Sequence, residues 1–190
     1  TGGGTLQDTL CGVEVSLSAH SFYQVNHDAA EQLYREAARL AALKPQETLL
    51  DLYCGAGTIG LSMVAPEQKL IGVEVVPSAV ENARKNARRA GVQNAEFLCA
   101  DAGKASQILA KRGLRPDVIV LDPPRKGCDN ATLEAVVHMA PSRIVIVSCN
   151  PATMARDAAA LREMGYTLQC YRPVDLFPRT AHCETVCLLS

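Results

Sequence analysis

The chain has 190 residues, of which 48% are hydrophobic, and its 19 Lys and Arg residues nearly balance its 20 Asp and Glu residues. This length favours one domain with a sizeable core, and the near-neutral charge excludes a polycation that holds nucleic acid by bulk electrostatics. The longest apolar runs are only as long as a strand, which excludes a membrane-spanning helix, so we expect no membrane partner.

Eight cysteines are scattered along the chain, and no two of them form a Cys-x-x-Cys pair. This spacing excludes the usual zinc and iron–sulfur motifs, so we expect no metal in this chain. In a domain that can bury its own core, scattered cysteines are typical of buried thiols in a reducing compartment. Because the chain begins at Thr1 without a secretion signal, we expect a cytoplasmic protein and a fragment of a longer one.

Residues 1–20 differ from the rest of the chain, because Gly2-Gly-Gly precedes an alternating apolar run from Val13 to Leu17. We interpret this segment as the remnant of a preceding domain together with a linker. Residues 21–190 are assigned to one further domain, which carries all the motifs described below.

Two helix starts show the pattern of a capping box, in which an acid follows the N-cap residue by three positions. Asp28 with Glu31 predicts the start of a helix before the first long strand, and Ser78 with Glu81 predicts a second helix that stops at Gly91. The apolar face of the first helix comprises Ala30, Leu33, Ala37 and Leu40.

Short β-rich runs alternate with helical stretches from Leu49 onward. The predicted strands are Thr48–Tyr53, Lys69–Glu74, Ala95–Cys99, Asp117–Leu121 and Arg143–Ser148. Alternation of strand and helix predicts a parallel sheet with helices on both faces, which is an α/β fold.

The end of the chain departs from this alternation. A helix is predicted over Ala152–Met164, and two β-rich runs follow at Thr167–Val174 and Glu184–Leu189 with no helical period between them. This pattern predicts an antiparallel hairpin at the edge of the sheet.

A glycine-rich segment, Asp51-Leu-Tyr-Cys-Gly-Ala-Gly-Thr-Ile-Gly, lies where the first long strand turns into a helix. Gly55, Gly57 and Gly60 let the backbone approach a ligand closely. Glu74 ends the next strand, where a carboxylate suits the ribose hydroxyls of a nucleotide-like ligand. The pattern is compatible with a dinucleotide and with S-adenosylmethionine.

Acidic residues at the strand ends separate these two ligands. Asp51 ends the first long strand, and Asp101 and Asp122 follow the third and fourth. Because the carboxyl ends of parallel strands meet at one rim, these carboxylates ring one crevice. An anion beside a pyrophosphate is unfavourable, whereas a cationic sulfonium is attracted to it. We therefore expect S-adenosylmethionine; a nicotinamide dinucleotide and a plain glycine turn are the alternatives.

The loop after the fourth strand reads Asp122-Pro-Pro-Arg-Lys-Gly. The two prolines fix φ and stiffen the loop. A rigid loop would hold Asp122 beside a methyl donor and Arg125 toward a nucleotide, because arginine pairs well with phosphate and with base edges. The alternative is a turn with a solvated basic pair.

Cys149 ends the fifth strand and precedes Asn150 and Pro151, which are typical of an N-cap and a first helical position. The unpaired N–H groups of a helix N-terminus favour an anion, so Cys149 is a candidate nucleophile. Glu184, which opens the last strand, is the candidate base. An acid in an otherwise apolar strand is, alternatively, an edge residue.

These residues resemble the RNA (uracil-5-)-methyltransferase family, whose members make 5-methyluridine in ribosomal and transfer RNA. The matching pieces are Ser-Phe-Tyr-Gln-Val-Asn at 21–26, the glycine segment at 51–60, Gly-Val-Glu at 72–74, Asp-Pro-Pro-Arg-Lys-Gly at 122–127, Ser-Cys-Asn-Pro-Ala-Thr at 148–153 and His-Cys-Glu-Thr-Val at 182–186. The resemblance covers nearly the whole chain, and several motifs in one order are highly specific.

The resemblance implies a class I S-adenosylmethionine-dependent methyltransferase fold. This fold is Rossmann-like, with a seven-stranded, mostly parallel sheet whose last strand is antiparallel, and residues 21–190 are its catalytic domain. The residues that would surround S-adenosylmethionine are Gln24, Tyr53, Gly55, Gly57, Thr58, Glu74, Asp101 and Asp122. Cys149 would be the nucleophile, Glu184 the base, and Phe22 and Arg125 would contact the RNA; core packing is the alternative for Phe22.

The reaction implied is methylation of uridine C5 through a covalent bond between Cys149 and C6. The segment after Cys149 resembles the branch that acts on 23S rRNA more than the tRNA branch. Methylation of tRNA or of another base, such as cytosine, and a non-catalytic module that binds S-adenosylmethionine or RNA are alternatives. Relatives commonly carry an N-terminal oligonucleotide-binding barrel, some carry an iron–sulfur cluster ahead of this domain, and some place Asn where this chain has Thr58.

Overall fold

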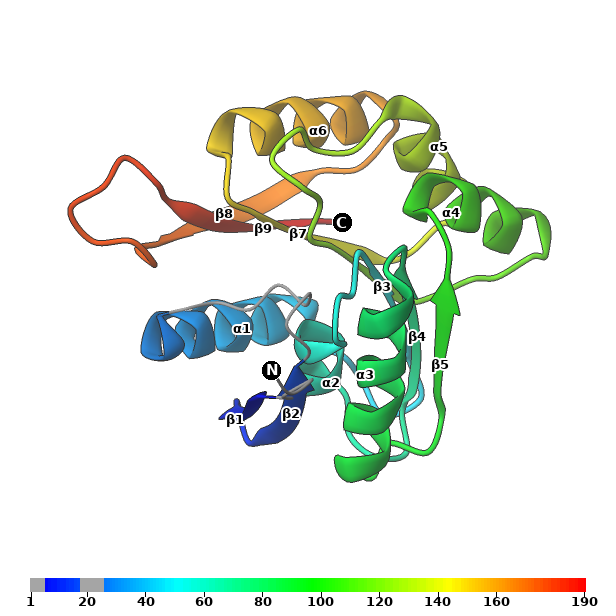
Figure 1. Cartoon of the computed structure of the whole chain (residues 1–190). Coiled ribbons are helices and arrows are strands. Elements are labelled where there is room, and N and C mark those ends of the chain that lie inside the picture. Colours follow the sequence, from blue (N-terminus) through cyan, green and yellow to red (C-terminus); the bar gives the residue numbers. More distant parts are fainter. Residues whose placement is uncertain (1–5, 18–25) are drawn as a thin grey trace.

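The computed structural model of the chain describes residues 6–17 and 26–190. A seven-stranded sheet in the order β5-β4-β3-β6-β7-β9-β8 forms its centre (Figure 1). The strands are β3 (Thr48–Leu52), β4 (Lys69–Glu74), β5 (Ala95–Cys99), β6 (Val118–Leu121), β7 (Arg143–Ser148), β8 (Leu168–Val174) and β9 (Glu184–Leu189). Strands β3 to β7 pair in parallel, and β9 runs antiparallel between β7 and β8. The predicted mostly parallel sheet with an antiparallel last strand is confirmed.

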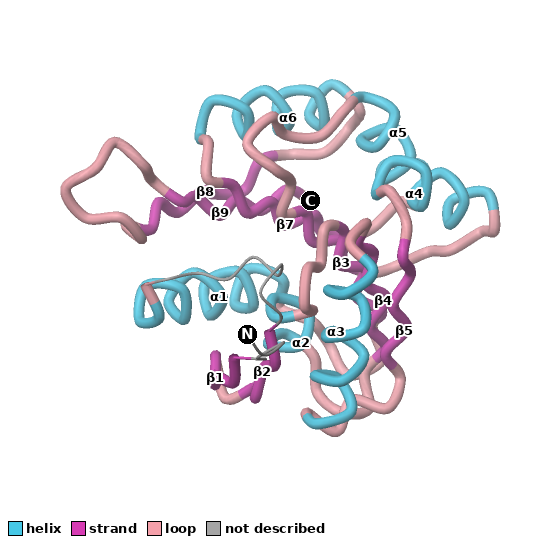
Figure 2. The backbone as a smooth tube through the Cα atoms, viewed as in Figure 1, coloured by secondary structure: helices cyan, strands magenta, loops and turns pink. Residues whose placement is uncertain are grey.

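Helices cover both faces of the sheet, as Figures 1 and 2 show. One face carries α1 (His27–Ala41), α2 (Thr58–Met63) and α3 (Pro77–Arg89), and the other carries α4 (Ala102–Lys111), α5 (Asn130–His138) and α6 (Pro151–Glu163). Successive strand residues point to opposite faces, so Leu49 packs in the cluster beneath α1 to α3 and Leu50 in the cluster beneath α4 to α6. Burial on both faces explains why the central strands are continuous apolar runs.

A two-stranded antiparallel hairpin precedes the sheet and consists of β1 (Leu6–Leu10) and β2 (Val13–Leu17). Its buried residues Leu10, Val13 and Val15 belong to the same apolar cluster as α1 and α3. The hairpin therefore packs against the main domain. The assignment of residues 1–20 to a preceding domain remains a prediction.

The capping box predicted at Asp28 and Glu31 is wrong. Helix α1 starts at His27, and its N-cap is Asn26, whose side chain accepts a hydrogen bond from the Ala29 amide at 3.3 Å. Glu31 instead accepts a hydrogen bond from the backbone amide of Cys11 at 2.8 Å, so its carboxylate ties the N-terminal hairpin to α1.

The capping box predicted at Ser78 and Glu81 is also wrong, although the helix exists. Helix α3 starts at Pro77, and its N-cap Val76 makes no side-chain cap. The amide of Val76 donates to Glu74 Oε1 at 2.9 Å, so an acid from the preceding strand occupies the place of the expected cap.

Two other local predictions are confirmed. Gly91, with φ of +72°, follows the end of α3 as a left-handed residue. Helix α6 starts at Pro151, and the side chain of its N-cap Asn150 accepts from the Ala152 amide at 3.1 Å.

All eight cysteines are free thiols, but they are not mostly buried as expected. Cys54, Cys128 and Cys187 are buried, Cys99 is exposed, and the others are half-buried. Among the described residues no helix has the length and apolarity needed to cross a membrane.

Candidate active site

A cavity of about 980 Å³ opens at the carboxyl ends of the parallel strands. The predicted site residues that line it are Tyr53, Gly55, Thr58, Glu74, Asp101, Asp122, Arg125, Cys149 and Glu184. Gln24 and Phe22 lie outside the described residues. Each motif between residues 51 and 184 that the sequence singles out therefore contributes residues to the wall of this one cavity.

The glycine loop is held by the carboxylate of Glu74. Glu74 Oε2 accepts from the Gly55 amide at 3.0 Å, and its Oε1 accepts from the Val76 amide at 2.9 Å. Two backbone N–H groups therefore fix the orientation of this carboxylate at the cavity wall. From the other side, the buried side chain of Asn86 in α3 donates to the Ala56 carbonyl at 3.0 Å.

Gly57 does not line the cavity with Gly55. Its φ is +81°, and a Cβ at this position would lie 3.2 Å from Ala83 Cβ and 3.3 Å from ring atom Cε1 of Phe97. Gly57 is the N-cap of α2, so the glycine allows the tight turn and the close packing of α2 against α3. Its contact with a ligand remains a prediction.

Asp51 lies beneath the glycine loop and is only 1% exposed. Its Oδ2 accepts from the Gly60 amide at 3.0 Å, and its Oδ1 has no hydrogen-bond partner among the described residues. Burial raises the pKa of Asp51 to about 7, and the nearby Glu74 adds to the rise. Asp51 therefore supports the loop from below and does not line the cavity. The expectation that its carboxylate belongs to the ring around the crevice is wrong, because the glycine loop buries it.

Two further carboxyl groups lie close together in the cavity wall. Burial raises the pKa of Asp122 to about 8, and the neighbouring carboxylates Asp51 and Glu184 raise it further. Burial also raises the pKa of Glu184, while the guanidinium of Arg125 opposes that rise. Asp122 and Glu184 thus place two acidic groups in the cavity wall, and a cationic ligand would stabilise their ionised forms.

Cys149 and Glu184 come from neighbouring strands. In the antiparallel ladder between β7 and β9, Ser148 pairs with Thr185. Continuation of this register places the next residue, Cys149, opposite Glu184, and both side chains line the cavity. The alternative interpretation of Glu184 as an edge residue is wrong, because β8 takes the edge and Glu184 is 4% exposed.

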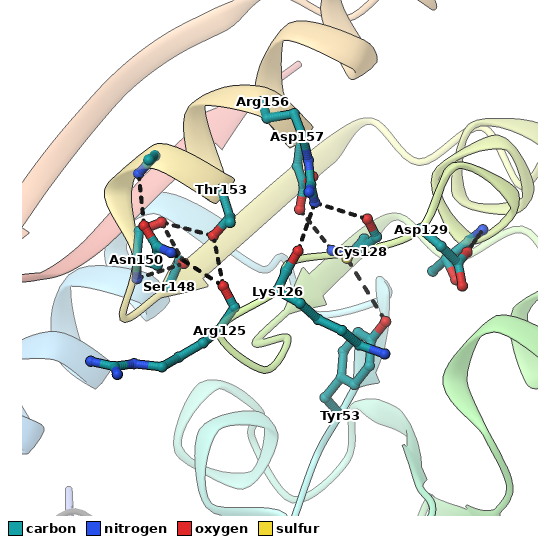
Figure 3. Close-up of polar contacts among 12 residues, drawn as sticks. Tyr53, Arg125, Lys126, Cys128, Asp129, Ser148, Asn150, Thr153, Arg156 and Asp157 are labelled. Carbon is teal, nitrogen blue, oxygen red and sulfur yellow. Dashed lines mark hydrogen bonds and ion pairs between the residues drawn. The ribbon is translucent and has the colours of Figure 1, made fainter.

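The loop between Asp122 and Cys128 follows β6 and lines the cavity beside the segment that follows β7. The guanidinium of Arg125 contacts His182 Nδ1 at 2.7 Å, so it lies near the start of β9. The Arg125 carbonyl accepts from Asn150 Nδ2 at 3.3 Å and from Thr153 Oγ1 at 3.2 Å (Figure 3). The backbone of the loop is thereby attached to α6, while the Arg125 side chain points away from that helix.

Three other predicted contact residues already have partners within the protein. Asp101 is the N-cap of α4, and its Oδ1 accepts from the Lys104 amide at 3.1 Å. Thr58 Oγ1 lies 3.4 Å from Tyr34 Oη. Tyr53, which has a left-handed φ of +68°, donates from its hydroxyl to Cys128 Sγ at 3.9 Å. These residues shape the cavity whether or not each one touches a ligand.

The sequence interpretation missed several residues at the cavity. Tyr34 and Arg156 line it, and the buried Asp157 accepts from the Cys128 amide at 2.8 Å. The sequence signal for Arg156 and Asp157 is weak, because a basic residue beside an acid is usual on a solvated helix. No group of three or more His, Cys, Asp or Glu side chains in residues 6–17 and 26–190 is arranged to hold a metal.

Comparison with known proteins identifies the family to which this chain belongs. The family model described as tRNA (Uracil-5-)-methyltransferase matches residues 13–190. An uncharacterized RNA methyltransferase of Halalkalibacterium halodurans is 46% identical over 97% of this chain and 40% of its own length. Another, from Clostridium acetobutylicum, is 41% identical over the whole chain and 41% of its own length. The chain therefore spans about two fifths of these relatives.

Solved structures agree with this result. The tRNA (uracil-54, C5)-methyltransferase of Pyrococcus abyssi, solved with S-adenosyl-L-homocysteine, superposes with a TM-score of 0.84 and 30% identity over all of this chain and 45% of its own. A SAM-dependent methyltransferase of Agrobacterium tumefaciens has a TM-score of 0.72 at 18% identity, over all of this chain and 70% of its own, and confirms the predicted methyltransferase fold. The chain belongs to the tRNA (uracil-5-)-methyltransferase family.

Proposed function

We propose that the protein containing this chain uses S-adenosylmethionine to methylate C5 of a uridine in RNA. One observation carries the proposal: Cys149 and Glu184 are the next residues beyond the last pair of the β7–β9 ladder, Ser148 and Thr185, and both lie in the wall of a cavity that also contains the glycine loop and Glu74. A nucleophile and a base beside a nucleotide-like cofactor site are the groups that this reaction needs.

The residues of the cavity fit S-adenosylmethionine. The carboxylate of Glu74 is held at the glycine loop, where it suits ribose hydroxyls, and Asp122 faces the cavity with Asp51 beneath the loop. These acids favour a sulfonium and disfavour the pyrophosphate of a dinucleotide. The homologue from Pyrococcus abyssi was solved with the demethylated form of this cofactor, which supports the same assignment. When bound, S-adenosylmethionine supplies the methyl group.

The side chains of this protein supply the remaining chemistry. The Cys149 thiolate adds to C6 of uracil, which forms a C–S bond and moves an electron pair to make C5 an enolate carbon. After C5 carries the methyl group, the Glu184 carboxylate takes the C5 proton. The electrons of that C–H bond restore the C5–C6 double bond, and the C–S bond breaks to release the thiolate. The raised pKa of the buried Glu184 makes its carboxylate a stronger base.

The RNA that we propose as substrate is 23S rRNA, in the reducing cytoplasm. The support is the segment Ser148-Cys-Asn-Pro-Ala-Thr-Met-Ala-Arg-Asp, which resembles the ribosomal branch of the family. Transfer RNA is the second candidate, favoured by the names of the family model and of the homologue from Pyrococcus abyssi. In either RNA the uridine has to leave its stack to reach Cys149, and Arg125 would contact its phosphate or base.

A trapping experiment tests this proposal. The full-length protein is incubated with S-adenosylmethionine and RNA that contains 5-fluorouridine, and the products are separated on a denaturing gel. Fluorine does not leave C5 as a proton does, so the bond to Cys149 persists and a shifted band is expected. The band should require S-adenosylmethionine and should vanish in Cys149→Ala. Transcripts of 23S rRNA segments and of tRNA, tested in parallel, identify the substrate.

Binding of S-adenosylmethionine without a shifted band for any transcript would contradict the proposal. That result would favour methylation of another base or a non-catalytic module. A band that persists in Cys149→Ala would show that a different nucleophile forms the bond.

A further inference from the structure

Helix α6 holds the loop from Asp122 to Cys128 through a set of hydrogen bonds that the proposed chemistry does not use. The bonds join loop carbonyl and amide groups to four helix or cap residues, as Figure 3 shows. Those residues are Asn150, Thr153, Arg156 and Asp157. The loop and the start of α6 therefore behave as one unit.

Arg156 lies at the centre of this set. Its Nη2 donates to the Lys126 carbonyl at 2.9 Å, to the Cys128 carbonyl at 3.1 Å and to Asp157 Oδ1 at 2.6 Å. Its Nε donates to the same Asp157 oxygen at 2.9 Å. The guanidinium thus bridges two loop carbonyls and one carboxylate, which the planar fork of arginine allows and a lysine ammonium on its flexible stem does not reproduce.

Asp157 completes the attachment from inside the protein. It is 1% exposed, and its Oδ2 accepts from the buried amide of Cys128 at 2.8 Å. Gly127 lies between the two attached carbonyls with φ of +76°, and a Cβ there would lie 2.5 Å from Asp157 Oδ2. The Arg156 and Asp157 side chains therefore fill the space that a side chain at 127 would need, which explains the glycine at the end of the loop motif.

This attachment joins two neighbouring segments that line the cavity. Helix α6 starts at Pro151, two residues after Cys149, so the helix that follows the nucleophile also fixes the loop that carries Asp122 and Arg125. We propose that Arg156 is a positioning residue: by its bonds to the loop carbonyls it sets the place of Asp122 and Arg125 relative to Cys149. The inference rests on the proposed function and deepens it.

The competing role for Arg156 is direct contact with RNA phosphate, because its side chain is 55% exposed and lines the cavity. The two roles differ in what they require. Phosphate contact needs the positive charge, which lysine keeps, whereas the attachment needs the fork of the guanidinium. Arg156→Lys therefore separates the roles, and Arg156→Gln removes both.

The test measures trapping of 5-fluorouridine RNA by the full-length protein over a range of RNA concentrations. We expect Arg156→Lys to lower the maximal trapping rate by about 10- to 100-fold, because a displacement of ~1 Å in a reacting group has effects of that size. The RNA concentration at half-maximal rate should change by less than about twofold. Arg162→Lys, on the exposed side of the same helix and away from this cavity, is the matched control and should behave like the parent. An Arg156→Lys protein with the parent rate, or one that restores what Arg156→Gln loses, would overturn the proposal.

Amide hydrogen exchange supplies a readout that does not depend on catalysis. Exchange at Gly127 and Cys128 should become faster by about tenfold or more in Arg156→Lys and Arg156→Gln, and should not change in Arg162→Lys. If the parent protein traps no RNA, the proposed function is wrong. The exchange rates at Gly127 and Cys128 alone then test whether Arg156 holds the loop. Unchanged exchange in both Arg156 variants would overturn it.

Discussion

Replacement of Gly72 by alanine tests how tightly the glycine loop is supported from the sheet. Gly72 lies in β4 and pairs with Phe97 of β5. A Cβ at this position would lie 2.5 Å from Phe97 Cδ1, 2.7 Å from Phe97 Cε1 and 2.9 Å from Cys54 Sγ. Carbon atoms in contact prefer about 3.5–4.0 Å, so the ring and the thiol have to move by roughly 1 Å.

This movement should lower the stability of the fold and also displace the glycine loop. Phe97 is 4% exposed and has no solvent to move into, so overpacking should lower the free energy of unfolding by about 1–3 kcal/mol. Cys54 precedes Gly55, whose amide binds Glu74, so displacement of the thiol also displaces the loop. We expect Gly72→Ala to bind S-adenosylmethionine more weakly than the parent.

Urea unfolding of four proteins measures the effect: the parent, Gly72→Ala, Phe97→Val and the double variant. Valine at 97 has neither the Cδ1 nor the Cε1 atom that the new methyl group meets, so alanine at 72 should cost at least about 1 kcal/mol less in that background. Two single effects that simply add, or a Gly72→Ala protein as stable as the parent, would refute the reasoning from contact distances.

Three further outcomes are expected. Glu184→Gln cannot take the C5 proton, so a donor-dependent covalent complex should accumulate on a denaturing gel even with ordinary uridine RNA; rapid turnover by this variant would remove Glu184 as the base. Glu74→Gln can accept from only one of the two backbone amides that its carboxylate binds, so calorimetry should show at least about tenfold weaker binding of S-adenosylmethionine. The folded-state pKa of Asp51, about 7, is above its ordinary value, so the folded protein holds that proton more tightly and loses stability as pH rises toward 7. Urea unfolding at pH 5, 6 and 7 should show a fall that is smaller in Asp51→Asn by on the order of 2 kcal/mol, and equal slopes would contradict the assignment.

The strands and the rim of the site follow from sequence because each depends on local pattern. Val118–Leu121 and Arg143–Ser148 are buried on both faces, which makes them continuous apolar runs. Parallel strands bring their carboxyl ends to one rim, so Glu74, Asp122 and Cys149 meet there without further information.

Features that depend on distant partners could not be predicted in this way. The Glu31 carboxylate accepts a hydrogen bond from the Cys11 amide, and the Glu74 carboxylate accepts one from the Val76 amide. These contacts replace the two capping boxes that the local sequence predicts. Gly57 and Gly55 look alike in sequence, yet only Gly55 lines the cavity, because the position of α3 decides what Gly57 contacts. The hydrogen bond from the Cys128 amide to Asp157 joins residues 29 positions apart, and no periodic pattern in the sequence indicates it.

The antiparallel pairing of β9 has a consequence for the tolerance of the site to insertions. The first residue of a parallel strand would lie at the far end of the sheet from the cavity, and only a reversed strand brings its opening residue, Glu184, to the rim. The position of Glu184, the proposed base, is therefore set by a backbone ladder and not by a loop. A slip of one residue between β7 and β9 would turn Glu184 to the opposite face of the sheet, so the number of residues from Glu184 to the end of β9 is fixed, whereas this register does not set the length of the loop at 175–183.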